Sequence, residues 1–174
     1  GSGLAAITGS ILAFVRTGDH LLMTDSVYEP ARGFCDGVLK DLGIETTYYD
    51  PLVGGGIAAL MRPNTTVVFT ESPGSLTFEI QDIPAIAAAA HAGGAVVLND
   101  NTCASPLSLR VLDLGADVAI HSLTKYVVGH SDAMLGAAVA NQATLARLQR
   151  SGYQYGHAAA PDDCYLALRG LRTV

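Results

Sequence analysis

Short apolar runs alternate with longer stretches of helical pattern along the whole chain. The runs are rich in β-branched residues and have the length of buried strands. They cover residues 20–24, 45–49, 66–70, 95–99 and 117–121. The helical stretches between them cover residues 4–15, 30–42, 56–61, 83–92 and 108–114. A further strand at 134–140, a helix at 143–150 and a helix from residue 162 onward complete the predicted set.

This alternation of strands and helices predicts βαβ units, because a parallel strand pair needs a crossover that is usually helical. Strands that are buried on both faces read as continuous apolar runs, as these do. We therefore expect an α/β fold in which a mostly parallel sheet lies between two helical layers, a three-layer αβα arrangement. Neither an internal repeat nor a linker interrupts residues 1–174, so the sequence predicts a single domain.

Composition narrows the classes of function. The chain has 10 basic and 16 acidic residues and a net charge of −6, which offers no basic surface for nucleic acid or an anionic membrane. No apolar run approaches the roughly 20 residues that a membrane span needs. The alanine-rich stretch at 85–92 is far shorter and is interpreted as a buried helix. A small-molecule ligand fits this composition better.

The cysteines and the start of the chain give two further expectations. Cys35, Cys103 and Cys164 are too far apart for a CxxC pair, so they indicate neither a zinc site nor a disulfide framework. We expect them to be reduced thiols of a cytoplasmic protein. The sequence lacks an initiator methionine and opens with helix-forming residues, so we expect it to be a piece of a longer protein.

Polar residues follow four of the apolar runs, where the predicted strands end. They are residues 25–28, 71–72, 100–102 and 122–125. Ligands of open α/β sheets bind outside the carboxyl ends of the strands, so we expect these residues to converge on one rim. Among them, Glu71 is interpreted as an anchor for backbone groups rather than as a catalytic acid.

Lysine is scarce in this chain, which contains only Lys40 and Lys125. Lys40 lies near the end of a predicted helix, where a cation interacts favourably with the helix dipole, and is interpreted as a surface residue. Lys125 follows a predicted strand and has apolar neighbours that would desolvate its amine. Such a lysine suits covalent chemistry through a Schiff base, although its position alone equally allows a capping or salt-bridged lysine.

Asp100 adds weight to the chemical interpretation because it directly follows the preceding predicted strand. A pyridine cofactor acts as an electron sink while its ring nitrogen is protonated, and a facing carboxylate keeps it protonated. A phosphate group needs hydroxyls and free amides at a helix N-terminus. Residues 2–4 open the first predicted helix, and Ser122 and Thr124 flank the lysine. Tyr28 is placed either to stack on such a ring or simply to pack.

These motifs together resemble the fold-type I, pyridoxal-phosphate-dependent enzymes of cysteine and methionine metabolism. The resemblance covers essentially the whole chain. The matching segments are SGLAAI (2–7), DSVYEPARGFC (25–35), ESPGSLTFEI (71–80), NDNTCASPL (99–107), SLTKYVVGHSD (122–132) and LALRGLRT (166–173). The γ-lyase and γ-synthase branches usually carry an asparagine-proline pair after ESP, whereas ESPGSLTFE resembles the β-lyase branch.

The resemblance implies pyridoxal 5'-phosphate as the cofactor and a large, cofactor-binding domain of this fold type. It makes Lys125 the residue that binds the cofactor covalently and moves the substrate α-proton. Asp100 becomes the partner of the ring nitrogen. The other implied cofactor-binding residues are Tyr28, which stacks on the ring and counts with Lys125 as catalytic, the amides of Gly3 and Leu4, and the hydroxyls of Ser122 and Thr124. No metal ligand is implied.

The activity that the resemblance implies is β-elimination at a carbon–sulfur bond, which would convert cystathionine to homocysteine, pyruvate and ammonia. Cystine and related thioethers stay open as substrates. Two alternatives also stay open: a γ-branch enzyme, or a non-catalytic cofactor-binding or assembly fragment, because the family has an N-terminal segment and a C-terminal domain that residues 1–174 do not match. The family forms homotetramers. Cys103 stands where the branch commonly has a bulky aromatic residue, and its effect stays open.

Overall fold

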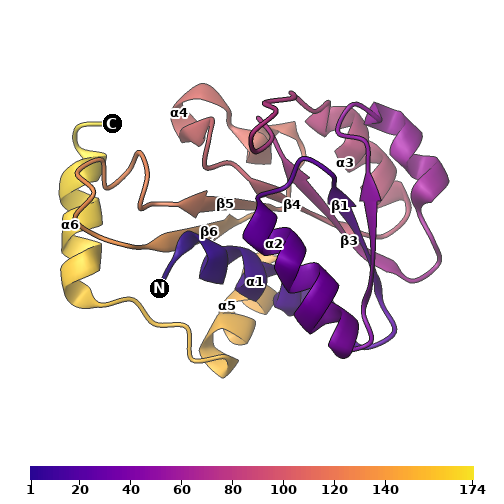
Figure 1. Ribbon diagram of the computed structural model, residues 1–174, viewed down its shortest axis with the longest axis horizontal. Helices are drawn as coiled ribbons and strands as arrows, with labels where there is room; N and C mark the ends of the chain where they lie inside the picture. Colours follow the sequence, from indigo (N-terminus) through magenta and orange to yellow (C-terminus); the bar gives the residue numbers. More distant parts are fainter.

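The computed structural model describes residues 1–174 and contains a six-stranded sheet covered by helices (Figure 1). The strands are β1 (His20–Thr24), β2 (Glu45–Tyr49), β3 (Thr65–Glu71), β4 (Val96–Asp100), β5 (Val118–Ser122) and β6 (Gly136–Ala140). Their order in the sheet is β2-β1-β3-β4-β5-β6. The first five strands run parallel, and β6 pairs antiparallel with β5. The predicted α/β fold with a mostly parallel sheet is confirmed.

Helices lie on both faces of this sheet (Figure 1). Helices α1 (Gly3–Phe14) and α2 (Glu29–Phe34) contribute to the core on one face, and Leu148 of α5 (Leu145–Gln154) packs against the same core. Helix α3 (Ile83–Ala92) contributes to the core on the other face. Helix α6 (Pro161–Leu171) packs by Ala167 against the connection between β5 and β6.

Successive side chains of the central strands enter two separate cores. In β3, Val67 and Phe69 join the core beneath α1 and α2, whereas Val68 joins the core beneath α3. Leu21 and Leu22 of β1 divide between the two cores in the same way. Side chains alternate across a strand, so a sheet that is apolar on both faces must be covered on both. The predicted three-layer arrangement is therefore confirmed.

The helix predicted at residues 30–42 is present and changes its winding part-way. A π-helical turn at Cys35–Leu39 follows α2 directly, and residues 40–41 are again α-helical. Gly33 and Gly37 each lower the helix propensity of this stretch by about 1 kcal/mol relative to alanine. The wider turn buries the side chains at both of its ends. The predicted helix is therefore confirmed, and its π-helical turn is the feature that periodicity did not predict.

Two shorter helices also differ from their predictions. Residues Gly54–Leu60 form a 3₁₀ helix, because three successive glycines make a regular α-helix unfavourable. The helix predicted at 108–114 is replaced by two separate turns, α4 (Ser105–Ser108) and a 3₁₀ turn at Val111–Leu114. Between them, Leu109 is extended, with φ −143° and ψ 113°, which breaks the helix.

Asp117 fixes the amino-terminal end of the sheet, opposite the rim where the polar motifs lie. Its Oδ2 accepts the Val97 amide at 2.8 Å and lies 2.9 Å from Nε2 of His91. Its Oδ1 accepts the side-chain amide of Asn141 at 2.7 Å. One buried carboxylate thus joins β4, α3 and the end of β6. No helix of the structure combines the length and the apolar character needed to cross a membrane.

Candidate functional site

The carboxyl ends of the parallel strands bring the predicted residues to one edge of the sheet. Glu71 and Asp100 are register partners and end β3 and β4. Ser122 ends β5, and Tyr28 follows β1 as the N-cap of α2. Because these ends belong to adjacent strands, residues that are far apart in the sequence meet on one rim, as expected for an open α/β sheet.

Asp100 is a buried carboxyl group without a cationic partner. It is 7% exposed, and its Oδ1 accepts the amide of Thr102 at 3.0 Å. None of the ion pairs in the structure includes it. Burial raises the pKa of Asp100, and hydrogen bonds from Thr102 oppose the rise. A cationic ring N–H facing this carboxyl group would supply the missing partner.

Thr102, which the sequence alone did not single out, joins the ends of β4 and β5. Its amide donates to Asp100, and its Oγ1 accepts the Ser122 amide at 2.8 Å. One residue thereby fixes the carboxyl group and the end of β5 relative to each other. The sequence signal was the DNT segment, in which an aspartate accepts an amide two residues later, the pattern of an Asx-turn.

Helix α1 begins beside Ser122. Ser2 caps the helix, because its Oγ accepts the Ala5 amide at 3.1 Å. In a helix that starts at Gly3, the amides of Gly3 and Leu4 have no carbonyl one turn earlier and stay available. A Cβ on Gly3 would lie 2.5 Å from the Cβ of Ser122, so glycine permits this close approach. Free amides, the helix dipole and a serine hydroxyl suit a phosphate group.

Lys125 lies in the turn that leaves β5 and is exposed, so the expectation that its apolar neighbours desolvate its amine is wrong. Its amide donates to the Ser122 carbonyl at 3.1 Å, and its carbonyl accepts the Gly129 amide at 2.9 Å. The Thr124 hydroxyl accepts the Leu135 amide at 3.0 Å and donates to the Leu135 carbonyl at 3.2 Å. The backbone of the lysine is therefore held on both sides. A phosphate role for Thr124 requires its hydroxyl hydrogen to turn away from Leu135.

Tyr28 presents a half-exposed ring, 46% exposed, next to the carboxyl pair of the rim. Its amide donates to Oε2 of Glu71 at 2.8 Å, and Oε1 of Glu71 accepts the Ser75 hydroxyl at 2.5 Å. Glu71 therefore anchors the backbone, as expected. The phenol of Tyr28 makes no hydrogen bond to another residue.

The proximity of Glu71 to Asp100 predicts a pH effect on stability. Burial, and after it the charge of Asp100, raises the pKa of Glu71 from 4.5 to about 7. A carboxyl group whose pKa is higher in the folded state stabilises the fold below its unfolded pKa and loses that contribution as the pH rises through the folded pKa. In the cofactor-free protein we expect this group to remove about 3 kcal/mol of unfolding free energy between about pH 4.5 and about pH 8.

Denaturant titrations across that pH range measure this loss. Glutamine at position 71 cannot ionise, so the unfolding free energy of Glu71→Gln should fall less as the pH rises. Glu29→Gln, which changes an exposed glutamate next to Tyr28, is the matched control and should keep the full fall. If the unfolding free energy of Glu71→Gln and of the unchanged protein depends on pH in the same way, ionisation of Glu71 does not destabilise the fold.

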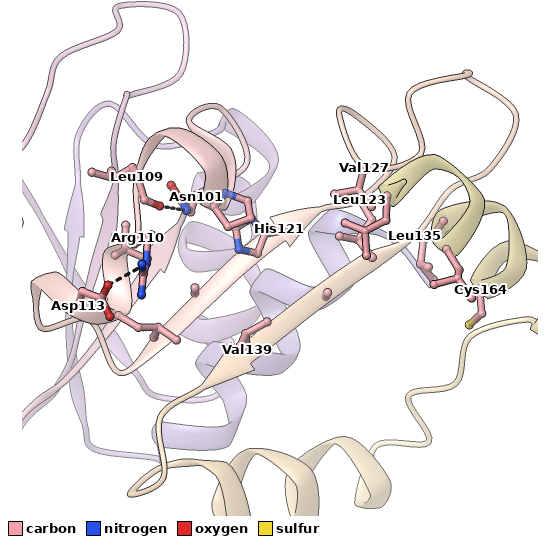
Figure 2. Close-up of a pocket in the computed structure, with 18 residues that line it drawn as sticks. Asn101, Leu109, Arg110, Asp113, His121, Leu123, Val127, Leu135, Val139 and Cys164 are labelled. Carbon is pink, nitrogen blue, oxygen red and sulfur yellow. Dashed lines mark hydrogen bonds and ion pairs between the residues drawn. The ribbon is translucent and has the colours of Figure 1, made fainter. Parts of the chain in front are cut away.

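An apolar cavity of about 570 Å³ lies between the sheet and α6 (Figure 2). Ala119 and His121 of β5 and Cys164 of α6 line it. Near its polar end, the side-chain amide of Asn101 donates to the Leu109 carbonyl at 2.8 Å. None of the seven predicted site residues lines this cavity, so it does not mark the predicted cofactor site.

The sequence of the chain matches a known protein family. The family model described as "Cys/Met metabolism PLP-dependent enzyme" matches residues 1–174. The chain belongs to this family. Enzymes of this family depend on pyridoxal phosphate, so this cofactor is the one that the family match supports.

Two members of the Cys/Met metabolism PLP-dependent enzyme family illustrate the similarity in sequence. A Rhizobium johnstonii protein, provisionally named cystathionine beta-lyase, is 56% identical over 173 residues, which are 99% of this chain and 44% of the relative. The cystathionine beta-lyase MetC of Escherichia coli K12 is 47% identical over 174 residues, again 99% of this chain and 44% of the relative. The chain spans less than half the length of these relatives.

A solved structure of the family supports the same fold. The cystathionine gamma-lyase from Lactobacillus plantarum, complexed with L-serine, matches with a TM-score of 0.94 and 34% sequence identity. The match covers 99% of this chain and 45% of that chain. The six-stranded domain described above is therefore a fold that this family of PLP-dependent enzymes shares.

Proposed function

We propose that the protein is a pyridoxal-phosphate-dependent carbon–sulfur lyase that converts cystathionine to homocysteine, pyruvate and ammonia. The observation that carries this proposal is the 47% identity, over 174 residues, to the cystathionine beta-lyase of Escherichia coli. The ESPGSLTFE segment also supports the β-lyase branch, because it lacks the asparagine-proline pair of the γ branches.

Different residues of the rim suit different parts of the cofactor. The free amides at the start of α1 suit its phosphate, and the buried carboxyl group on β4 suits its ring nitrogen. We assign Gly3, Leu4, Ser122 and Thr124 to the phosphate, Tyr28 to the ring face, Asp100 to the ring nitrogen and Lys125 to the covalent bond.

Lys125 carries the proton transfers of the proposed reaction. When bound, pyridoxal phosphate supplies a sink for the electron pair left by the substrate α-proton. Nζ of Lys125 accepts that proton and delivers a proton to the departing sulfur as the bond between Cβ and sulfur breaks. Water then converts the three-carbon product to pyruvate and ammonia. The Asp100 carboxylate would face the ring nitrogen and keep it protonated.

Analysis of the keto acid formed from L-cystathionine tests the proposal. We expect pyruvate and homocysteine in equal amounts, because β-elimination breaks the bond between sulfur and the three-carbon half. Chromatography of the derivatised keto acids measures both products. 2-Oxobutyrate and cysteine would instead show the γ-elimination of a γ-branch enzyme. Cofactor bound without either product would identify a non-catalytic cofactor-binding or assembly domain.

The proposal extends to organisation and location. We propose that residues 1–174 are the cofactor-binding domain of a longer protein that also has an N-terminal segment and a C-terminal domain, because the relatives are more than twice as long. Assembly as a homotetramer follows from the resemblance to the family. A cytoplasmic location is supported by Cys35, Cys103 and Cys164, which are all free thiols.

A further inference from the structure

One buried carboxyl group connects three parts of the candidate site. Glu71 is 6% exposed and ends β3 beside Asp100. Its two oxygens accept the amide of Tyr28 and the hydroxyl of Ser75. We propose that Glu71 is a positioning residue that fixes Tyr28 for stacking on the cofactor ring. This inference rests on the proposed cofactor site and names the residue that shapes it.

The carboxyl group of Glu71 is the only hydrogen-bond partner that Tyr28 has on β3. It is the N-cap of α2 but makes no side-chain capping bond. Its carbonyl accepts the amides of Ala31 and Arg32 at 2.9 and 3.3 Å, which orients the following helix. Its ring is half-exposed. The bond from its amide to Glu71 is therefore the hydrogen bond that sets its place relative to β3.

The loop after β3 shares the same anchor. The Ser75 amide donates to the Ser26 carbonyl at 2.8 Å, which lies two residues before Tyr28. A Cβ on Gly74 would lie 2.5 Å from Oγ of Ser26, so this loop and the segment that leads to Tyr28 are in close contact. Glu71 joins the two segments through one oxygen each. Loss of its carboxyl group removes one hydrogen bond from each segment.

Glu71 acts through Tyr28 rather than on the substrate. Both carboxyl oxygens already accept hydrogen bonds from the protein, and the group is buried. A buried amide left without an acceptor is costly, so removal of the carboxyl group shifts Tyr28 toward water. A misplaced ring weakens stacking on the cofactor without any change in the residues that touch it.

Cofactor binding and the circular dichroism of the bound cofactor test this role in the purified full-length protein. Glu71→Ala should weaken pyridoxal phosphate binding about tenfold and change the dichroism of the visible band. Glu71→Gln keeps an acceptor for the Tyr28 amide and a donor for Ser75, and should restore both readouts. Glu29→Gln is the control and should match the unchanged protein. If Glu71→Ala does not fold, Glu71→Asp, which is shorter but keeps the charge, takes its place.

A double-variant cycle separates positioning from general stability. If Glu71 acts through Tyr28, then Tyr28→Ala combined with Glu71→Ala should bind cofactor within about twofold of Tyr28→Ala alone. Losses that multiply would overturn the inference, as would an unchanged dichroism in Glu71→Ala. Either result would leave the proposed function intact as long as the cofactor still attaches to Lys125. An unchanged protein that never attaches the cofactor to Lys125 would remove both proposals.

Discussion

Replacement of Lys125 by alanine is expected to abolish turnover and the visible absorbance band of the covalently bound cofactor. An amine is needed both for the covalent bond and for removal of the α-proton, and alanine supplies neither. The chain has one other lysine, Lys40. We expect a loss of about 10³-fold or more in the rate of elimination. Pyruvate release and an absorbance spectrum with added pyridoxal phosphate measure the two effects.

Lys40→Ala is the matched control for this experiment. Lys40 is exposed at the end of the π-helical turn that follows α2, remote in sequence from the rim. Its replacement should leave the band and the rate unchanged. Borohydride reduction and peptide mapping should place the reduced cofactor on Lys125. A reduced cofactor found on Lys40, or a band that survives Lys125→Ala, would contradict the assignment.

The sheet was predictable because its four central strands are buried on both faces. Each predicted strand begins and ends within about two residues of the observed one. For β1, β3, β4 and β5 the reason is that a continuous apolar run is the pattern that two covering layers require, whereas β2 and β6 at the sheet edges are less buried. The helices were less predictable. The change from α- to π-helix at Cys35 and the 3₁₀ helix at Gly54–Leu60 depend on small differences in backbone energy and on packing, which periodicity does not report.

The rim of the site was predictable for a similar reason. Once the strands are parallel, residues that follow them must gather at one edge, so Asp100 and Ser122 were expected to be neighbours. The links between them were not expected. The two bonds of Thr102 and the close approach of Gly3 to Ser122 depend on tertiary geometry. Neither leaves a periodic pattern in the sequence.

Asp100→Asn is expected to lower the rate of elimination by about 10²-fold or more. Asparagine has nearly the same shape and keeps an oxygen for the Thr102 amide, but it has no charge to hold the ring nitrogen protonated. The cofactor ring should therefore withdraw electrons less strongly, while the shape of the site is unchanged. The rate of pyruvate release and the cofactor affinity measure the effect. Asp41→Asn, which changes an exposed aspartate without a hydrogen-bonding role, is the control.

The same substitution, Asp100→Asn, should raise the stability of the cofactor-free protein although it lowers the activity. The charge of Asp100 is one cause of the raised pKa of Glu71, so its removal should lower that pKa. A smaller difference between folded and unfolded pKa means a smaller loss of stability as the pH rises above 4.5. Asp100→Asn should therefore be less active but more stable near neutral pH. A variant that is both inactive and less stable would show that Asp100 serves the fold rather than the cofactor.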